Sequence, residues 1–194
     1  DGLGGERERW ESSIAALEAA LYNLVGDSLL AAAFLSYCGP FDTNYRSALL
    51  KDSWLKTVRT HGIPCSENFD FCNFMANPED VRDWIIQGLP ADAFSTENGV
   101  IVTRGTRWPL MIDPQEQANR WIRNMEGSAL KVVTLRQSDY LRTLENAIAF
   151  GQPVLMQEVL EELDPSLEPI LSRAIVKVGN RQVIKIGDKD VDYN

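Results

Sequence analysis

The sequence is poor in the residues that build metal and redox sites. It has one histidine, His61, and three cysteines, Cys38, Cys65 and Cys72, none of which form a C-x-x-C pair. An odd number of cysteines fits poorly with a disulfide framework, so we expect free thiols in a reducing compartment. The spacing of Cys65 and Cys72 with His61 matches no zinc pattern, so we predict no metal site and place His61 at a helix end on the surface.

Basic residues are also in deficit, with 19 Lys and Arg against 28 Asp and Glu and a net charge of −9. Nucleic acids and anionic membranes both require a basic surface, so we predict no nucleic-acid and no membrane partner. We find no apolar run approaching the ~18 to 20 residues that span a bilayer, and no signal or transit peptide. Because an initiating Met is absent too, we expect a segment of a longer polypeptide.

The composition that is present is that of an ordinary folded protein. Hydrophobic residues make up 44% and charged residues 24% of 194 positions, enough for one good-sized domain or two small ones.

The first half of the chain has helical patterns. Residues 6–25 carry apolar side chains spaced four, three, four and three apart: Trp10, Ile14, Leu17, Leu21 and Leu24. This stripe is equally typical of a short coiled-coil seam and of the core face of an amphipathic helix. We expect Gly26 to end this helix and Asp27 or Ser28 to cap a second, wholly buried helix over residues 29–37.

Three further helices are predicted before residue 105. One covers residues 44–60, is capped by Asp42 or Thr43, and has a core face of Tyr45, Leu49, Trp54, Leu55 and Val58. A packed loop over 63–77 follows, then a helix over 79–87 that starts at Pro78. Its apolar side chains are Val81, Trp84, Ile85 and Ile86. A short helix opens with Ser95 to Asn98 as its cap.

The second half alternates strand and helix. We predict strands over 109–112, 130–135 and 153–159, and helices over 115–125, 139–150 and 165–173. Such alternation favours a mainly parallel, doubly wound sheet. Residues 175–178 and 182–186 flank Gly179-Asn180, which indicates a β-hairpin.

The loop after the first predicted strand has the setting of a nucleotide-binding loop without its chemistry. A P-loop reads G-x-x-x-x-G-K-[ST], with glycine backbone and a lysine around the phosphates. Here Asp113 and Ala118 replace the glycines, Asn119 the lysine and Arg120 the hydroxyl residue. The whole degenerate loop is Asp113, Pro114, Gln115, Glu116, Gln117, Ala118, Asn119 and Arg120.

A carboxylate at Asp113 about 4 Å from a phosphate oxygen would cost roughly 4 kcal/mol per charge pair at an effective dielectric near 20. Neutral Asn119 would not offset that cost. The residues alone also permit a plainer interpretation, a strand–loop–helix unit that never had a ligand.

Several long motifs resemble the dynein heavy chain, in wording closer to the axonemal than to the cytoplasmic type. They are Leu35-Ser36-Tyr37-Cys38-Gly39-Pro40-Phe41, Val81-Arg82-Asp83-Trp84, Gly88-Leu89-Pro90, Ser95-Thr96-Glu97-Asn98-Gly99, Arg107-Trp108-Pro109-Leu110-Met111-Ile112-Asp113-Pro114-Gln115, Phe150-Gly151-Gln152-Pro153-Val154-Leu155 and Glu161-Glu162-Leu163-Asp164-Pro165. The match is to the base of the returning stalk helix and most of the large subdomain of the fifth AAA+ module.

The resemblance implies an α/β fold: an N-terminal helical segment followed by an incomplete P-loop-like (AAA+) three-layer αβα sheet with a β-hairpin near the C-terminus. It divides the chain into residues 1–62, the stalk base and end of the preceding small subdomain, and 63–194, a truncated, degenerate large subdomain. It also implies that the strand between the first and third parallel strands lies downstream, leaving a gap. Direct pairing of those two strands would contradict this order.

The resemblance also locates the second nucleotide motif at the end of the third strand. Gln157 stands where an ATPase has its Mg²⁺-orienting Asp, and Glu158 where it has its water-activating Glu. The acidic residues Glu158, Glu161, Glu162 and Asp164 match no Ca²⁺ loop or acid/base pair, and we interpret them as a solvated helix start.

The function implied is that of a non-catalytic, mechanical segment of a ciliary motor ATPase that moves toward microtubule minus ends. The resemblance implies no catalytic residue and no cofactor in this segment, with ATP and Mg²⁺ in other modules. Implied partners are neighbouring AAA+ modules, the microtubule through the stalk tip, and intermediate and light chains. The implied location is the cytoplasm and cytoskeleton, in the axoneme of a cilium or flagellum.

Alternatives to this function remain open. The loop could still bind Mg·ATP with Arg120 in the lysine role, an exposed face could recruit an accessory chain, or Arg173 or Arg181 could reach a neighbouring module as an arginine finger.

Overall fold

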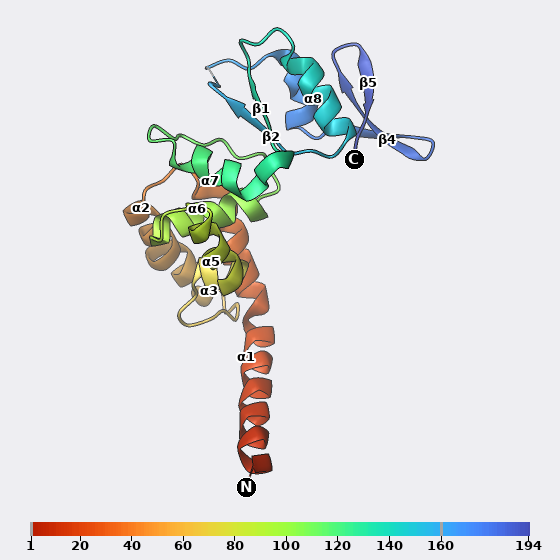
Figure 1. Ribbon diagram of the computed structural model, residues 1–194. Helices are drawn as coiled ribbons and strands as arrows, with labels where there is room; N and C mark the ends of the chain where they lie inside the picture. Colours follow the sequence, from red (N-terminus) through yellow and green to blue (C-terminus); the bar gives the residue numbers. More distant parts are fainter. Residues whose placement is uncertain (1, 160) are drawn as a thin grey trace. The chain divides into compact units, whose positions relative to one another are not determined.

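The computed structural model describes residues 2–159 and 161–194, with side chains from residue 5 onward. The chain forms two compact units, unit 1 ending at Pro109 and unit 2 spanning Leu110–Asn194 (Figure 1). This division reflects packing within the chain and differs from the division predicted at residue 62. The predicted division concerns modules of a larger ring, and it stays a prediction.

Unit 1 is helical. Its elements are α1 (Gly2–Tyr37), α2 (Thr43–Ser47), the π-helix η1 (Ala48–Trp54), α3 (Leu55–Thr60), α4 (Phe71–Met75), α5 (Pro78–Ile86) and α6 (Ala93–Arg104).

Helix α1 does not end at Gly26, and the prediction that glycine stops it is wrong. Residues 63–66, here called the strap, cross the helix at this point. The Gly26 N–H donates to the Pro64 carbonyl (3.1 Å), and a Cβ at Gly26 would lie 2.2 Å from that oxygen. Asp27 does not cap a new helix, since its carboxylate accepts from the Ser66 N–H (2.8 Å) and hydroxyl (2.5 Å). Glycine is therefore required at position 26 because the backbone of the strap lies directly against the helix there.

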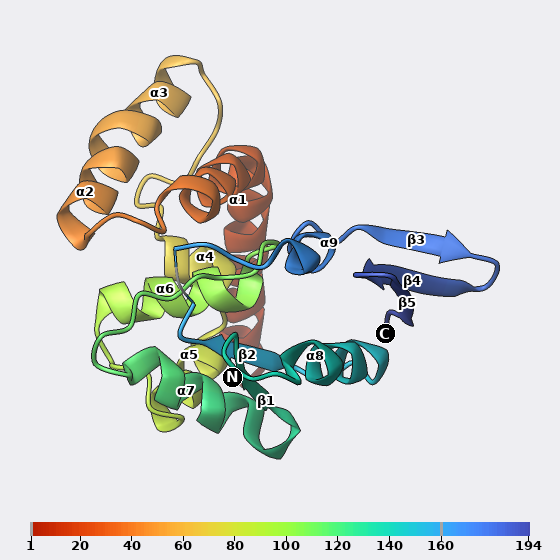
Figure 2. The same cartoon turned by 90° about the horizontal axis from the view of Figure 1, so that it is seen from above.

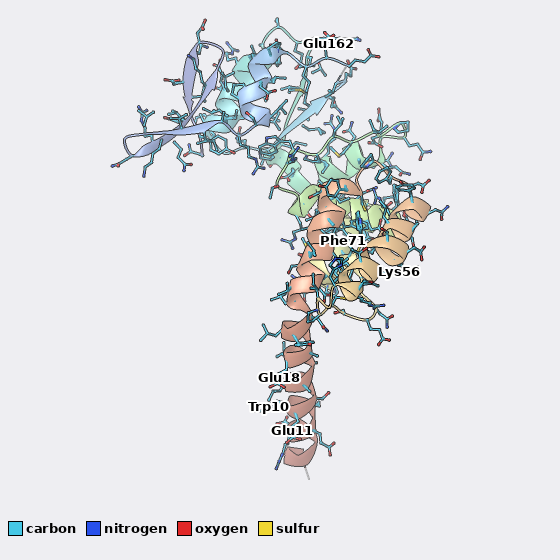
Figure 3. All side chains as sticks on the ribbon, turned by 180° about the vertical axis from the view of Figure 1, so that it is seen from behind. Trp10, Glu11, Glu18, Lys56, Phe71 and Glu162 are labelled. Atoms are coloured by element: carbon cyan, nitrogen blue, oxygen red, sulfur yellow. The ribbon has the colours of Figure 1, made fainter. Side chains whose placement is uncertain are left out.

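The apolar stripe of α1 is exposed, which contradicts the core-face interpretation within this chain. Trp10 is 73% and Leu21 71% exposed, and even Leu24 is 44% exposed. Trp10 and Glu18 lie on the part of α1 that extends beyond the other helices of unit 1 (Figure 3). The coiled-coil interpretation stays a prediction.

Helix α1 contains, within Gly5–Tyr37, an 18-residue window with a mean hydropathy of 1.4, so by length and composition alone it could cross a membrane. Our expectation that no run approaches this limit was therefore wrong. The part of α1 that carries Leu30, Ala31 and Phe34 is buried in the core of unit 1.

The core of unit 1 forms around the end of α1. Phe34 stacks on Phe71 of α4 with ring centroids 4.0 Å apart, so the predicted loop 63–77 contains a packed helix. The helix over 29–37 is not buried all round, since Leu29 is 49% and Tyr37 65% exposed.

The helical run 43–60 occurs as predicted, and Asp42 caps it through the Tyr45 N–H (2.8 Å). Most of the predicted face is covered, since Val58 is buried and Leu49, Trp54 and Leu55 are half-buried. Tyr45 is the exception at 52% exposed, and Arg46 and Leu50 are buried beside that face.

Helices α5 and α6 form close to where the sequence predicts them, and only the start of α6 differs. Pro78 occupies the first turn of α5 as predicted, although Ile86 is 75% exposed. Helix α6 begins earlier than expected, because Asp92 and not Ser95 is its cap: the Asp92 carboxylate accepts from the Ser95 N–H (2.9 Å) and hydroxyl (2.7 Å). These bonds hold the pKa of Asp92 below its usual value.

The three cysteines are free thiols. Burial raises the pKa of Cys38 to about 11 and that of Cys72 to about 12. Both thiols are therefore protonated at neutral pH, and the reactive thiolate form is suppressed.

Unit 2 is α/β. Its elements are α7 (Gln117–Glu126), η2 (Gly127–Ala129), β1 (Lys131–Thr134), α8 (Tyr140–Ala149), β2 (Val154–Gln157), η3 (Pro165–Leu167), α9 (Glu168–Leu171), β3 (Ile175–Val178), β4 (Arg181–Ile186) and β5 (Lys189–Asp192).

Strands β1 and β2 pair in parallel, with Lys131 opposite Val154 and Thr134 opposite Gln157. They are the second and third predicted strands, joined through α8. The first predicted strand, 109–112, is not a strand, and Leu110 and Ile112 are 73% and 87% exposed. A strand needs a neighbour for its backbone groups. The first and third predicted strands do not pair in the described residues, so the predicted order and gap stay predictions.

The C-terminal sheet is larger than the predicted hairpin. β3 and β4 pair antiparallel around Gly179 (φ 62°), as predicted, and β5 adds to β4 through a turn with Gly187 (φ 59°). Figure 2 shows the three strands side by side. Ile184, Ile186 and Val191 are buried against α8 and α9 residues such as Ile148 and Ile170.

Candidate functional site: the degenerate nucleotide loop

The loop that precedes α7 is held by its own first residue. One Asp113 carboxylate oxygen accepts from the Gln117 N–H (2.9 Å) and the other from the Asn119 N–H (2.8 Å). The first N–H groups of a helix have no partner within the helix and are where phosphates bind in P-loops. Here a carboxylate of the chain occupies two of them.

These two hydrogen bonds give Asp113 a second role besides the charge repulsion predicted from the sequence. The sequence suggested a carboxylate that would repel a phosphate across a short distance. The structure shows in addition that it uses the donors a phosphate would need. The helix begins at Gln117, two residues later than predicted, after Glu116 in the left-handed region (φ 56°).

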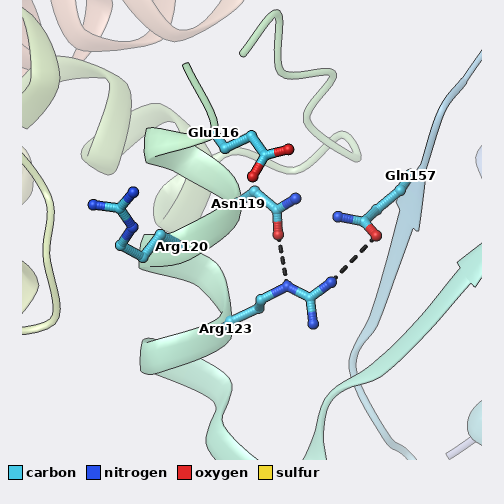
Figure 4. A pocket seen from close by; sticks show the side chains of 5 residues that line it. All are labelled: Glu116, Asn119, Arg120, Arg123 and Gln157. Atoms are coloured by element: carbon cyan, nitrogen blue, oxygen red, sulfur yellow. Dashed lines mark hydrogen bonds between the residues drawn. The ribbon is translucent and has the colours of Figure 1, made fainter. Parts of the chain in front are cut away.

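A second contact joins the loop to the end of β2. The Arg123 guanidinium donates from Nε to the Asn119 side-chain oxygen (2.7 Å) and from Nη2 to that of Gln157 (3.2 Å), as Figure 4 shows. Asn119 and Gln157 are the positions of the P-loop lysine and of the Mg²⁺-orienting aspartate in the sequence template. One arginine thus bridges two neutral amides.

The cavity beside this bridge has a volume of about 370 Å³ and is lined by Glu116, Asn119, Arg120, Arg123 and Gln157. Among these lining residues only Glu116 carries a carboxylate. The Arg120 guanidinium, the predicted alternative to the lysine, points away from Arg123 and Gln157 (Figure 4). The lining therefore offers one carboxylate beside two amides and two guanidinium groups, whereas Mg²⁺ is bound by oxygen ligands, most often carboxylates.

The remaining acidic candidates do not meet at one point. Glu158 follows β2 with φ 53° and lies 3.9 Å from Arg136 at the surface. Asp164 accepts from the Tyr140 hydroxyl (2.6 Å) and the Ser166 N–H (2.9 Å), which caps η3. Within the described residues no group of three or more His, Cys, Asp or Glu is placed to hold a metal ion.

The Asp164 contacts predict a pH dependence of stability. The hydroxyl and N–H donors hold the pKa of Asp164 below its ordinary 3.8, so the folded state favours the ionised form. Its contribution is present above pH 3.8 and is lost as the pH falls through the lower folded-state pKa. We expect Asp164→Asn to destabilise unit 2 at pH 6 and to do so less at pH 2.5, measured by urea unfolding.

Tyr140→Phe is the matched variant, since it removes the hydroxyl donor and leaves the ring packed on Val133 and Leu144. It should reduce the same pH dependence. An unchanged dependence in both variants would show that the Tyr140–Asp164 bond has no such role.

Sequence reasoning named Arg120 and missed Arg123. The available signal was the spacing of Asn119 and Arg123, four residues apart on one helix face. Arg181, a candidate arginine finger, pairs with Asp192 across β4 and β5 (3.2 Å).

A loop leading into a helix, followed by two parallel strands joined through a second helix, defines unit 2 as an α/β module. The comparisons with known proteins specify the class further. The model of the ATP-binding dynein motor region matches residues 82–194, and that of the microtubule-binding stalk of the dynein motor matches residues 1–58.

The chain is 62% identical to the dynein-1-beta heavy chain of the flagellar inner arm I1 complex of Chlamydomonas reinhardtii. It is 58% identical to dynein axonemal heavy chain 2 of Mus musculus and of Homo sapiens. Each match covers 100% of this chain and 4% of the relative's length. The chain belongs to the dynein heavy chain family, with axonemal members among its relatives, as its motifs indicated.

Proposed function

We propose that this chain is a non-catalytic, mechanical segment of a ciliary dynein heavy chain: the base of the returning stalk helix and a fifth AAA+ module that does not bind nucleotide. The observation that carries the proposal is the Asp113 carboxylate on the N–H groups of Gln117 and Asn119. An ATP phosphate would have to displace it and would meet its charge. The Arg123 bridge to Gln157 supports the same conclusion.

The exposed stripe of α1 supports the stalk assignment. Its five apolar side chains have heptad spacing and lie within the residues that match the dynein stalk model. Such a seam buries itself against a second helix, and the proposed partner is the other strand of an antiparallel stalk. Residues 1–62 then form the stalk base, and 63–194 the degenerate module.

At the level of the whole motor, the heavy chain hydrolyses ATP with Mg²⁺ in other modules and moves toward microtubule minus ends. This segment passes ring movement to the stalk, whose tip binds the microtubule. Its neighbours are AAA+ modules of the same chain, with intermediate and light chains in the complex. The names of the relatives, axonemal and flagellar, support a location in the axoneme of a cilium or flagellum.

The test is thermal unfolding of the chain with and without millimolar Mg·ATP. We expect no shift of the midpoint. A ligand at 100 times its dissociation constant would add about 2.7 kcal/mol, worth very roughly 5 to 10 °C for a domain of this size. An upward shift of that size would contradict the proposal and favour the alternative, a module that binds ATP through Arg120.

Asp113→Ala is the companion variant. It removes the carboxylate from the start of α7, so we expect the free energy of unfolding to fall by about 1 kcal/mol, as for other lost helix caps. The Mg·ATP measurement on this variant then shows whether Asp113 alone keeps nucleotide out.

A further inference from the structure

Arg46 is almost completely buried, with 1% of its surface exposed, and joins two helices that lie far apart in sequence. From Nε and Nη2 it donates to the carbonyls of Cys38 (3.0 Å) and Gly39 (3.1 Å), just beyond the end of α1. From Nη1 and Nη2 it donates to the side chains of Glu97 (2.9 Å) and Asn98 (2.8 Å) on α6.

The geometry makes this contact stiff. Carbonyls at the end of a helix lack partners within it, and the planar guanidinium fork fixes the direction of each bond. The Arg46 guanidinium also lies 4.3 Å from the centre of the Phe94 ring of α6. Because Arg46 is buried, movement of the end of α1 relative to α6 would leave its charge with fewer partners, which costs free energy.

The two helices have different parts in the proposed function. Helix α1 lies within the residues that match the dynein stalk, and α6 within those that match the ATP-binding motor region. Arg46 itself comes from α2, between them in sequence, and touches both. In the part of the chain that the structure describes, Arg46 supplies the side-chain hydrogen bonds and the ion pair that join residues 38 and 39 to α6.

We propose that Arg46 is a positioning residue that transmits movement of α1 to α6, and so couples the stalk to the motor region. This inference rests on the proposed function, because it requires α1 to move with the stalk. Loss of the Arg46 fork should uncouple microtubule binding at the stalk tip from ATP hydrolysis in the ring without affecting either process by itself.

The test uses a dynein heavy chain that contains this sequence, with Arg46→Lys, which keeps the charge and removes the fork. The measurements are ATPase rates with and without microtubules. We expect an unchanged basal rate and a ~5-fold or greater loss of microtubule stimulation, the lower range of typical coupling between sites. Arg59→Lys is the matched control, since Arg59 is exposed and donates to the Glu67 carbonyl (2.7 Å).

Glu97→Gln is a second variant, which removes the charge of one Arg46 partner and keeps its shape. It tests the coupling proposal if the Arg46→Lys motor fails to fold. Full stimulation in a folded Arg46→Lys or Glu97→Gln motor would overturn the coupling proposal and leave the proposed function standing. A wild-type motor without microtubule stimulation would overturn both.

Discussion

Replacing Gly26 with alanine should lower the free energy of unfolding of unit 1 by about 1 to 3 kcal/mol, the cost of overpacking a filled site. Helix propensity alone predicts the opposite sign, a gain of up to about 1 kcal/mol for alanine inside a helix. We expect the steric clash to outweigh the gain in helix propensity, because the new Cβ would lie 2.2 Å from the Pro64 oxygen and 2.7 Å from the Cys65 Cβ. Backbone atoms cannot rotate away as a side chain can.

The measurement is urea unfolding followed by circular dichroism, with Gly5→Ala as the control. Gly5 lies in the same helix and has nothing within 4 Å of an added Cβ, so only propensity acts there. We expect Gly5→Ala to be neutral or slightly stabilising. If Gly26→Ala were as stable as wild type, the strap would not be in close contact with α1.

Replacing Arg46 with methionine should destabilise unit 1 by about 3 to 5 kcal/mol, the range for breaking a buried ion pair by removing one partner. Methionine keeps much of the volume, so the loss comes from the groups left behind. These are the Gly39 carbonyl, the Asn98 oxygen, and the Glu97 carboxylate, whose side chain is only 20% exposed. The Cys38 carbonyl loses one of its two donors and keeps the Phe41 N–H.

A double variant separates the charge from the packing. In Arg46→Met with Glu97→Met no unpaired carboxylate remains, so part of the lost stability should return. The control is Lys56→Met, since Lys56 and its partner Asp52 are 68% and 73% exposed and such pairs contribute about 0 to 1 kcal/mol. An Arg46→Met variant within 1 kcal/mol of wild type would contradict the role given to the buried bonds.

Features with local causes could be predicted from the sequence. Pro78 opens α5 because its fixed backbone angle suits a first turn, and Gly179 forms its hairpin because the turn needs a positive φ. Gly26 and Arg46 depend on distant partners, Pro64 and Glu97, so the sequence gives no local sign of them. The prediction of a strand over 109–112 was wrong for a related reason: a strand forms only where a second strand lies beside it, and the sequence of one segment does not show whether that neighbour is present.

The same contrast holds at the candidate site. Comparison with the P-loop motif and with the strand-end motif of ATPases showed that Asp113 and Gln157 lack the chemistry for Mg·ATP. Residue types at a fixed spacing are enough for that conclusion. The comparison could not show that the Asp113 carboxylate accepts hydrogen bonds at the start of α7, or that Arg123 contacts both Asn119 and, 34 positions further along the chain, Gln157. Such contacts follow from how the loop folds back, which spacing does not encode.

The strap gives α1 a fulcrum. It touches the helix at Gly26 and Asp27, and at 1.5 Å per residue Gly5 lies about 32 Å along the axis on one side, with Tyr37 about 16 Å on the other. The arms of this lever differ roughly twofold in length. A tilt of about 10° would move Gly5 sideways by about 5 Å, while the end beside Arg46 moves sideways by less than about 3 Å. A side-chain-sized adjustment beside Arg46 thereby becomes a lateral displacement about twice as large at Gly5.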